Sequence, residues 1–113
     1  MRQLFHPSIE DVSLESILHA LSDPVRVAIF RDIAGATCSM TCSTFASVGG
    51  RSIPKSSLSQ HFKVLREAGL IRSERKGVEM LNTPRCAEVN ARFPGLLEAV
   101  LNAYVVQAKE GAA

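Results

Sequence analysis

One amphipathic stretch constrains the fold more than any other part of the chain. Leu58, Phe62 and Leu65 recur at positions i, i+4 and i+7, which is the spacing of one buried face of an α-helix. Gly69 follows this stripe and suits the left-handed residue that ends many helices. We therefore predict a helix over residues 54–68 with one side packed on a core and the other side open.

Two short strands are predicted directly after this helix. Residues 70–75 and 78–82 have the pattern of β-strands, and Lys76 and Gly77 between them supply a turn. The sequence thus places a β-hairpin immediately behind an amphipathic helix.

Two further helices are predicted before the stretch. Residues 12–21 carry apolar side chains at helical spacing, and a second helix begins at Pro24 and stops at Gly35. Asp23 can cap the free amides of the second helix, whose first position suits a proline. The residues expected to be buried on the second helix are Val25, Ala28, Ile29 and Ile33.

A shorter helix is predicted over residues 42–48, followed by a turn over residues 49–52. This helix, the turn and the helix over residues 54–68 would together form a helix-turn-helix. The hairpin that follows would make the arrangement a winged one.

The last predicted helix, over residues 94–108, carries a broad apolar stripe. A short polar segment between Pro84 and Pro94 precedes it. The stripe consists of Leu97, Val100, Leu101, Tyr104 and Val105, with Leu96 at its edge. Because the first and last helices are more apolar than one small core requires, we expect them to form the interface of a homodimer.

The predicted fold class is mainly α-helical with a small β-hairpin wing, a dimeric winged helix-turn-helix. We assign residues 1–11 to an N-terminal arm, residues 12–108 to the winged domain and residues 109–113 to a tail. A length of 113 residues suits one domain. Dimerisation would add buried surface to its modest core.

Composition limits the classes of function. A hydrophobic fraction of 46% argues against disorder, and no apolar run approaches the roughly 18 residues of a membrane span. The first ten residues lack the apolar stretch of a secretory signal, and three cysteines do not suit a secreted disulfide scaffold. We therefore expect a cytoplasmic protein. Because the net charge is only +2, binding to nucleic acid would depend on local positive charge.

The open side of the helix over residues 54–68 suits contact with DNA. Ser56, Ser57 and Gln60 are small or hydrogen-bonding residues near its N-terminal half, where a helix in the major groove meets base edges. Lys55 and Lys63 can meet phosphates. The alternative is an ordinary amphipathic helix whose polar side is only solvated.

The hairpin carries a basic cluster beside this helix. Arg72, Arg75 and Lys76 lie on or near its tip, as contact with phosphates or with the minor groove requires. The alternative is a charged edge that prevents aggregation. The helix and the hairpin together favour double-stranded DNA as the partner.

Two sequence segments resemble the ArsR/SmtB family of transcriptional repressors. They are Leu21-Ser22-Asp23-Pro24-Val25-Arg26 and Ser57-Leu58-Ser59-Gln60-His61-Phe62-Lys63-Val64-Leu65-Arg66-Glu67-Ala68-Gly69-Leu70-Ile71. The resemblance covers roughly residues 14 to 105. It implies a winged-helix homodimer that represses an operon and leaves its operator when an inducer binds. Because a twofold dimer places two recognition helices in successive major grooves, we expect the operator to be an inverted repeat.

The resemblance also bears on His61, whose family counterpart helps to fix the helix that reads DNA. We interpret His61 mainly as a structural histidine beside Phe62, with a contact to a DNA base or a role as a ligand as the alternatives. The predicted DNA-binding residues are Lys55, Ser56, Ser57, Ser59, Gln60, His61, Lys63, Arg72, Arg75 and Lys76.

Cysteine spacing raises the question of an inducer. Cys38 and Cys42 have i, i+4 spacing and could bind a soft ion or form a disulfide after rearrangement, and Cys86 could supply a third thiolate. The family's arsenic-type box has one residue between two cysteines, whereas this chain has three, which weakens a metalloid assignment. Inert thiols, a redox or reactive-sulfur switch, and metal or metalloid sensing all stay open.

Other functions find less support. The family's zinc site on the last helix needs histidines, which residues 94–113 lack, and Glu98 and Glu110 alone make a poor site. The sequence has no glycine-rich phosphate loop and no hydrolase motif, and nothing would orient Cys42 and His61 as nucleophile and base. We expect no enzymatic activity, no cofactor and no resident metal. A winged helix that binds protein instead of DNA is the remaining alternative.

Overall fold

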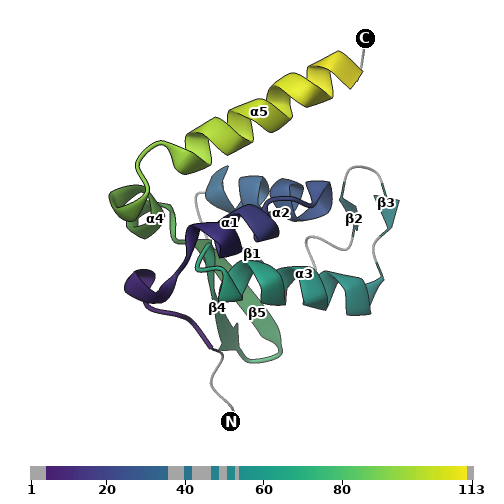
Figure 1. Cartoon of the computed structure of the whole chain (residues 1–113). Coiled ribbons are helices and arrows are strands. Elements are labelled where there is room, and N and C mark those ends of the chain that lie inside the picture. The colour runs from purple at the N-terminus through teal and green to yellow at the C-terminus, as the bar shows by residue number, and fades with distance from the viewer. Residues whose placement is uncertain (1–4, 36–39, 42–46, 49–50, 53, 112–113) are drawn as a thin grey trace.

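A computed structural model describes residues 5–35, 40–41, 47–48, 51–52 and 54–111 of the chain. Helices make up most of it, and a β-hairpin extends from their middle (Figure 1). The elements in chain order are the 3-10 helix η1 (Ile9–Asp11), α1 (Leu14–Ala20), α2 (Pro24–Gly35), β1 (Met40–Thr41), β2 (Ser47–Val48), β3 (Arg51–Ser52), α3 (Lys55–Glu67), β4 (Ile71–Lys76), β5 (Glu79–Pro84), α4 (Cys86–Arg92) and α5 (Leu96–Gly111).

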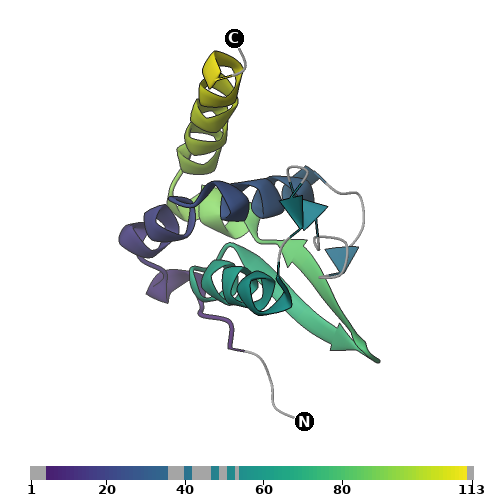
Figure 2. The same ribbon diagram turned by 90° about the vertical axis from the view of Figure 1, so that its right-hand side faces the viewer.

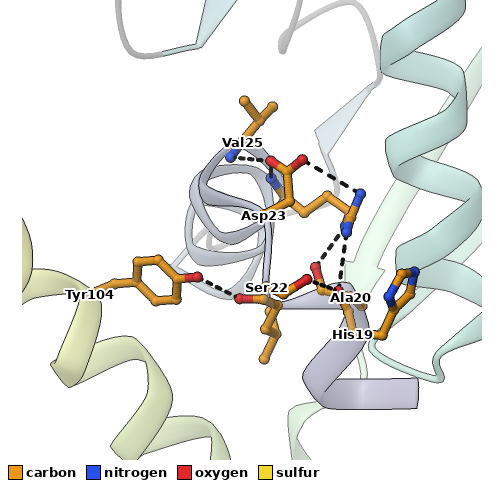
Figure 3. Close-up of polar contacts among 8 residues, drawn as sticks. His19, Ala20, Ser22, Asp23, Val25 and Tyr104 are labelled. Atoms are coloured by element: carbon orange, nitrogen blue, oxygen red, sulfur yellow. Dashed lines mark hydrogen bonds and ion pairs between the residues drawn. The ribbon is translucent and has the colours of Figure 1, made fainter. Parts of the chain in front are cut away.

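The connection between α1 and α2 is fixed by hydrogen bonds (Figure 3). Oδ1 of Asp23 accepts the backbone N–H of Val25 at 2.7 Å, so this residue caps α2 as predicted, and Pro24 occupies the first helical position. The guanidinium group of Arg26 donates to the carbonyl oxygens of His19 and Ala20. The segment from residue 21 to 26 that carries the family resemblance is therefore the rigid corner between two helices.

Helix α2 buries a different set of side chains from the predicted one. Val27, Ile29, Phe30 and Ile33 are buried, while Val25 and Ala28 are only half-buried. The predicted stripe was thus right at residues 29 and 33 and wrong at residues 25 and 28. Because α2 is apolar on more than one side, its spacing alone admits several buried faces.

Helix α3 has the buried face that its sequence predicts. Leu58, Phe62 and Leu65 are 6%, 3% and 0% exposed. The residue after its C-terminal Ala68 is Gly69, whose φ of +79° is the predicted left-handed conformation. Helix α3 packs against both α2 and the start of the hairpin.

The hairpin belongs to a three-stranded antiparallel sheet with the order β1-β5-β4. In its register Ser73 lies opposite Asn82 and Lys76 lies opposite Glu79. Gly77 therefore belongs to a two-residue connection with Val78, one position later than the predicted turn, and its φ is +63°. Strand β4 lies at the edge of this sheet.

The prediction of a helix over residues 42–48 is wrong at its C-terminal end. Ser47 and Val48 form strand β2, which pairs with β3 in a separate two-stranded sheet. Val48 lies opposite Arg51, and the two residues between them in the sequence are glycines, which favour hairpin connections over helices. Residues 42–46 lie outside the described part of the chain.

The polar segment predicted between the hairpin and the last helix contains the short helix α4, which buries Val89. Helix α5 then turns back toward the α1–α2 corner, where the hydroxyl of Tyr104 donates to the carbonyl oxygen of Leu21 at 2.8 Å (Figure 3). In both overall views α5 lies at one end of the molecule and the hairpin at the other (Figures 1 and 2). No helix in the described residues is both long and apolar enough to span a membrane.

Candidate nucleic-acid interface

Helix α3 presents a polar stripe directly opposite its buried face. Ser56, Gln60 and Lys63 share the spacing i, i+4, i+7, and all three are exposed. Glu67 continues the same stripe at the C-terminal end of the helix and is also exposed. Because a carboxylate repels phosphates, the N-terminal and central part of the stripe is the part suited to a polyanion.

The other predicted residues of α3 flank this stripe. Ser57 and Ser59 are exposed on its two sides. His61 is half-buried, and its Nδ1 atom is buried without a hydrogen-bond partner in the described part of the chain. Lys55 begins the helix, and its side chain lies outside what the structure describes.

The structure separates the basic residues of the hairpin. Ser73 is buried against the helix side of β4, and Arg75, two residues later, projects from the same face because side chains alternate along a strand. Arg72 projects from the opposite face. A hydrogen bond from Arg85 and the charges of Arg85 and Arg72 lower the pKa of the Glu88 carboxyl on α4, against a smaller effect of burial. Arg72 thus lies near α4, whereas Arg75 lies on the face shared with α3.

Buried polar groups join α3 to the base of the hairpin. The hydroxyl of Ser73 donates to Oδ1 of Asn82 at 2.7 Å, and Arg66 in the last turn of α3 donates to the same hydroxyl at 3.4 Å. Ser73 and Asn82 are 3% and 1% exposed. This cluster was not predicted, although paired polar residues at inward positions of two strands were visible in the sequence.

The tip of the hairpin carries an apolar residue that was not predicted as functional. Val78 is 96% exposed at the turn. Arg75 is exposed beside it, while the side chain of Lys76 lies outside what the structure describes. The tip therefore combines the cationic Arg75 and Lys76 and the acidic Glu79, which lies opposite Lys76, with one exposed aliphatic group.

The predicted sensing residues Cys38 and Cys42 lie outside the described residues. Cys86 begins α4 as a half-buried free thiol, whose pKa is raised by burial and lowered in smaller measure by a backbone hydrogen bond. Among the described residues no group of three or more histidine, cysteine, aspartate or glutamate side chains could hold a metal ion.

Comparison with known proteins shows which domains and structures this geometry is similar to. A model described as a helix-turn-helix domain matches residues 21–74, which extend from the α1–α2 corner into β4. The fold is similar to the crystal structure of an ArsR family transcriptional regulator, with a TM-score of 0.60, 22% identity and coverage of 86% of this chain and 92% of that one. It is also similar to an ArsR-like transcriptional regulator from Rhodococcus sp. RHA1, with a TM-score of 0.58, 26% identity and coverage of 88% and 92%. The chain is thus similar to helix-turn-helix domains over residues 21–74 and has the fold of ArsR-family transcription regulators.

The predicted resemblance and winged fold are thereby confirmed. The sequence matches no curated protein. ArsR-family proteins of this fold are transcription regulators and not enzymes. In this winged helix-turn-helix fold α3 corresponds to the recognition helix, and β4 and β5 form the wing.

Proposed function

We propose that the chain is an ArsR-family regulator that binds double-stranded operator DNA with the N-terminal part of α3 in the major groove and the wing beside it. The exposed stripe of Ser56, Gln60 and Lys63 carries this proposal, since these side chains can reach base edges and phosphates. Arg75 supports it because this cation projects from the strand face shared with α3. The basic wing would then contact the neighbouring sugar-phosphate backbone.

The proposed DNA-binding unit is a homodimer formed through α1 and α5. Leu14 and Leu18 lie one turn apart on α1 and are 40% and 46% exposed, and Val106 on α5 is 55% exposed. The C-terminal half of α5 extends beyond the rest of the molecule, away from the wing (Figures 1 and 2). A second copy would cover these apolar side chains and leave both recognition helices open.

A twofold dimer places two recognition helices about one helical turn of DNA apart, roughly 34 Å, so the operator would be an imperfect inverted repeat. The proposed role is repression in the cytoplasm, relieved by a small inducer. Oxidation or reactive sulfur at Cys38 and Cys42 is the favoured signal, on the basis of their spacing in the sequence. A metal or metalloid response through the same thiolates is the alternative.

Replacement of Gln60 by alanine tests the placement of α3. We expect Gln60→Ala to weaken binding to a duplex selected by the wild-type chain from a random pool by about 1–3 kcal/mol, because a bidentate contact to a base is lost. Binding to an unrelated duplex should change little. Gel-shift titration of both duplexes gives the two affinities. Equal affinity and preference in the variant and the wild type would contradict the placement, and a wild-type chain that selects no duplex would favour a protein-binding winged helix.

Replacement of Arg75 by alanine tests the wing. We expect Arg75→Ala to weaken binding to selected and unrelated duplexes alike, because a phosphate contact carries no sequence information. The plot of log affinity against log salt should become shallower by about one unit. Arg31→Ala is a matched control, since Arg31 is an exposed arginine on α2. An unchanged slope for Arg75→Ala would remove this residue from the interface.

A further inference from the structure

Residues 5–12, which comprise the described part of the predicted N-terminal arm and Val12 after it and are called the arm from here on, lie against the junction between the recognition helix and the wing. Val12 at its end is 3% exposed. A Cβ atom added to Gly69 would come within 2.4 Å of Cγ2 of Val12, so the arm passes directly over the glycine that ends α3. The arm therefore contacts the point where the chain leaves the recognition helix and enters β4.

One side chain of the arm contacts the edge of the wing. Nε2 of His6 accepts the backbone N–H of Ser73 at 2.9 Å. As an acceptor, this nitrogen carries no proton, so the imidazole is neutral with its proton on Nδ1. Strand β4 is an edge strand, and His6 thus satisfies a backbone donor on the side of β4 away from β5.

The residue that His6 contacts is also the residue that joins the wing to the recognition helix. The hydroxyl of Ser73 bonds with Asn82 on β5 and with Arg66 on α3. Ser73 is thus tied to the arm through its backbone and to both α3 and β5 through its side chain. Arg75, the proposed phosphate contact, lies only two residues further along the same strand face.

Further contacts hold the arm in place beyond His6. Nη1 of the buried Arg85 donates to the carbonyl oxygen of Pro7 at 2.8 Å. Arg92 on α4 donates to the carbonyl oxygens of Ile9 and Val12. Because the backbone is fixed from Pro7 to Val12, the imidazole of His6 is presented to β4 from a nearly rigid base.

We propose that His6 is a positioning residue for DNA binding, which fixes the wing relative to the recognition helix so that Arg75 meets the duplex that α3 reads. This inference rests on the proposed function. His6 itself does not touch DNA. Because His6 holds the wing in place before DNA binds, the wing loses less conformational entropy on binding, as a preorganised ligand does.

The local part of the proposal is tested without DNA. Exchange of the Ser73 backbone N–H with solvent, followed by NMR, should be about fivefold faster or more in His6→Ala, since one hydrogen bond is lost. The amide of Ala99 in α5, which donates to the carbonyl oxygen of Gly95 just before this helix, should exchange at the wild-type rate in this variant. His6→Gln should restore slow exchange at Ser73 because its carbonyl oxygen can accept the same N–H. Unchanged exchange in His6→Ala would overturn the anchoring role.

The functional part is tested with the duplex selected by the wild-type chain and an unrelated duplex. His6→Ala should bind both about fivefold more weakly, with a shallower salt dependence, because the contribution of the wing is reduced. His6→Gln should recover affinity and slope. Ser8→Ala is the matched control, since Ser8 is exposed in the same arm and its hydroxyl donates locally to the carboxylate of Asp11. A merely structural role would lower stability without changing the salt slope.

The outcomes separate this inference from the function on which it rests. If the wild-type chain binds DNA and His6→Ala has the same affinity and the same salt dependence, the role of His6 is overturned while the proposed function stands. Equal losses in Ser8→Ala and His6→Ala would also overturn it, because the effect would then belong to the arm in general. A wild-type chain that binds no duplex would overturn the proposed function, together with the role of His6 in DNA binding, whatever the exchange experiment showed.

Discussion

Leu18→Glu is expected to leave the chain folded as a monomer and to lower affinity for the selected duplex by about a hundredfold or more. Leu18 is 46% exposed in the single chain, so a carboxylate there stays solvated when the chain is alone. In a dimer it would be buried in an apolar contact without a partner. Loss of the dimer removes the second half-site from each binding event, and with it the gain in effective concentration.

Sedimentation gives the oligomeric state for this prediction and gel shift gives the affinity. Ser16→Glu is the matched control, because it adds the same charge on the other side of α1. Glutamate suits this position, since the backbone N–H of residue 16 is capped by Ser13 at the helix N-terminus. A Leu18→Glu chain that remained dimeric with full affinity would show that α1 lies outside the interface.

Gly69→Ala is expected to lower the free energy of unfolding by about 2–5 kcal/mol. The left-handed conformation at φ +79° costs an alanine about 1–2 kcal/mol. Its Cβ would also lie 2.4 Å from Cγ2 of Val12, and overpacking of a core costs about 1–3 kcal/mol more. Urea denaturation at one fixed protein concentration measures the loss.

Gly77→Ala separates the cost of the left-handed backbone from the cost of the clash between residue 69 and Val12. Gly77 has a similar φ of +63°, but a Cβ there meets nothing within 4 Å, so only the backbone cost applies. Gly69→Ala should therefore be the more destabilising of the two. Equal losses at both glycines would contradict the close packing of the arm over the end of α3.

Local periodicity was enough to predict the parts that carry the proposed interface. In α3 a single apolar stripe, ended by Gly69, leaves one choice of buried face, and the predicted Leu58, Phe62 and Leu65 are all buried. The wing was predicted to within two residues, because two short alternating runs flank a glycine turn. The exposed stripe of α3 follows directly from these two features.

Other elements depended on information that local spacing does not contain. Helix α4 has seven residues and buries only Val89, too little for a periodic pattern. On α2, the neighbours β5 and α3 select the buried face from several apolar ones. Residues 47 and 48 pair with residues 52 and 51, and this strand pairing overrides the helix predicted there.

The arm illustrates the same limit for function. His6 and Ser73 lie 67 residues apart in the sequence, and Arg85 and Pro7 lie 78 apart, so no local pattern connects them. Their chemistry is visible in the sequence, but their meeting depends on the packing of α4 and β4 around the arm. The placement of the wing relative to the arm and to α3 therefore depends on tertiary contacts, although its two strands were predicted from the local sequence.

An NMR titration of the labelled chain with its selected duplex tests the central claim most directly. We expect the largest amide shifts on Ser56, Ser57 and Gln60, with a second group at the wing around Arg75, while α5 changes little. Shifts concentrated on α5, or a polar stripe of α3 that does not respond to any duplex, would contradict it.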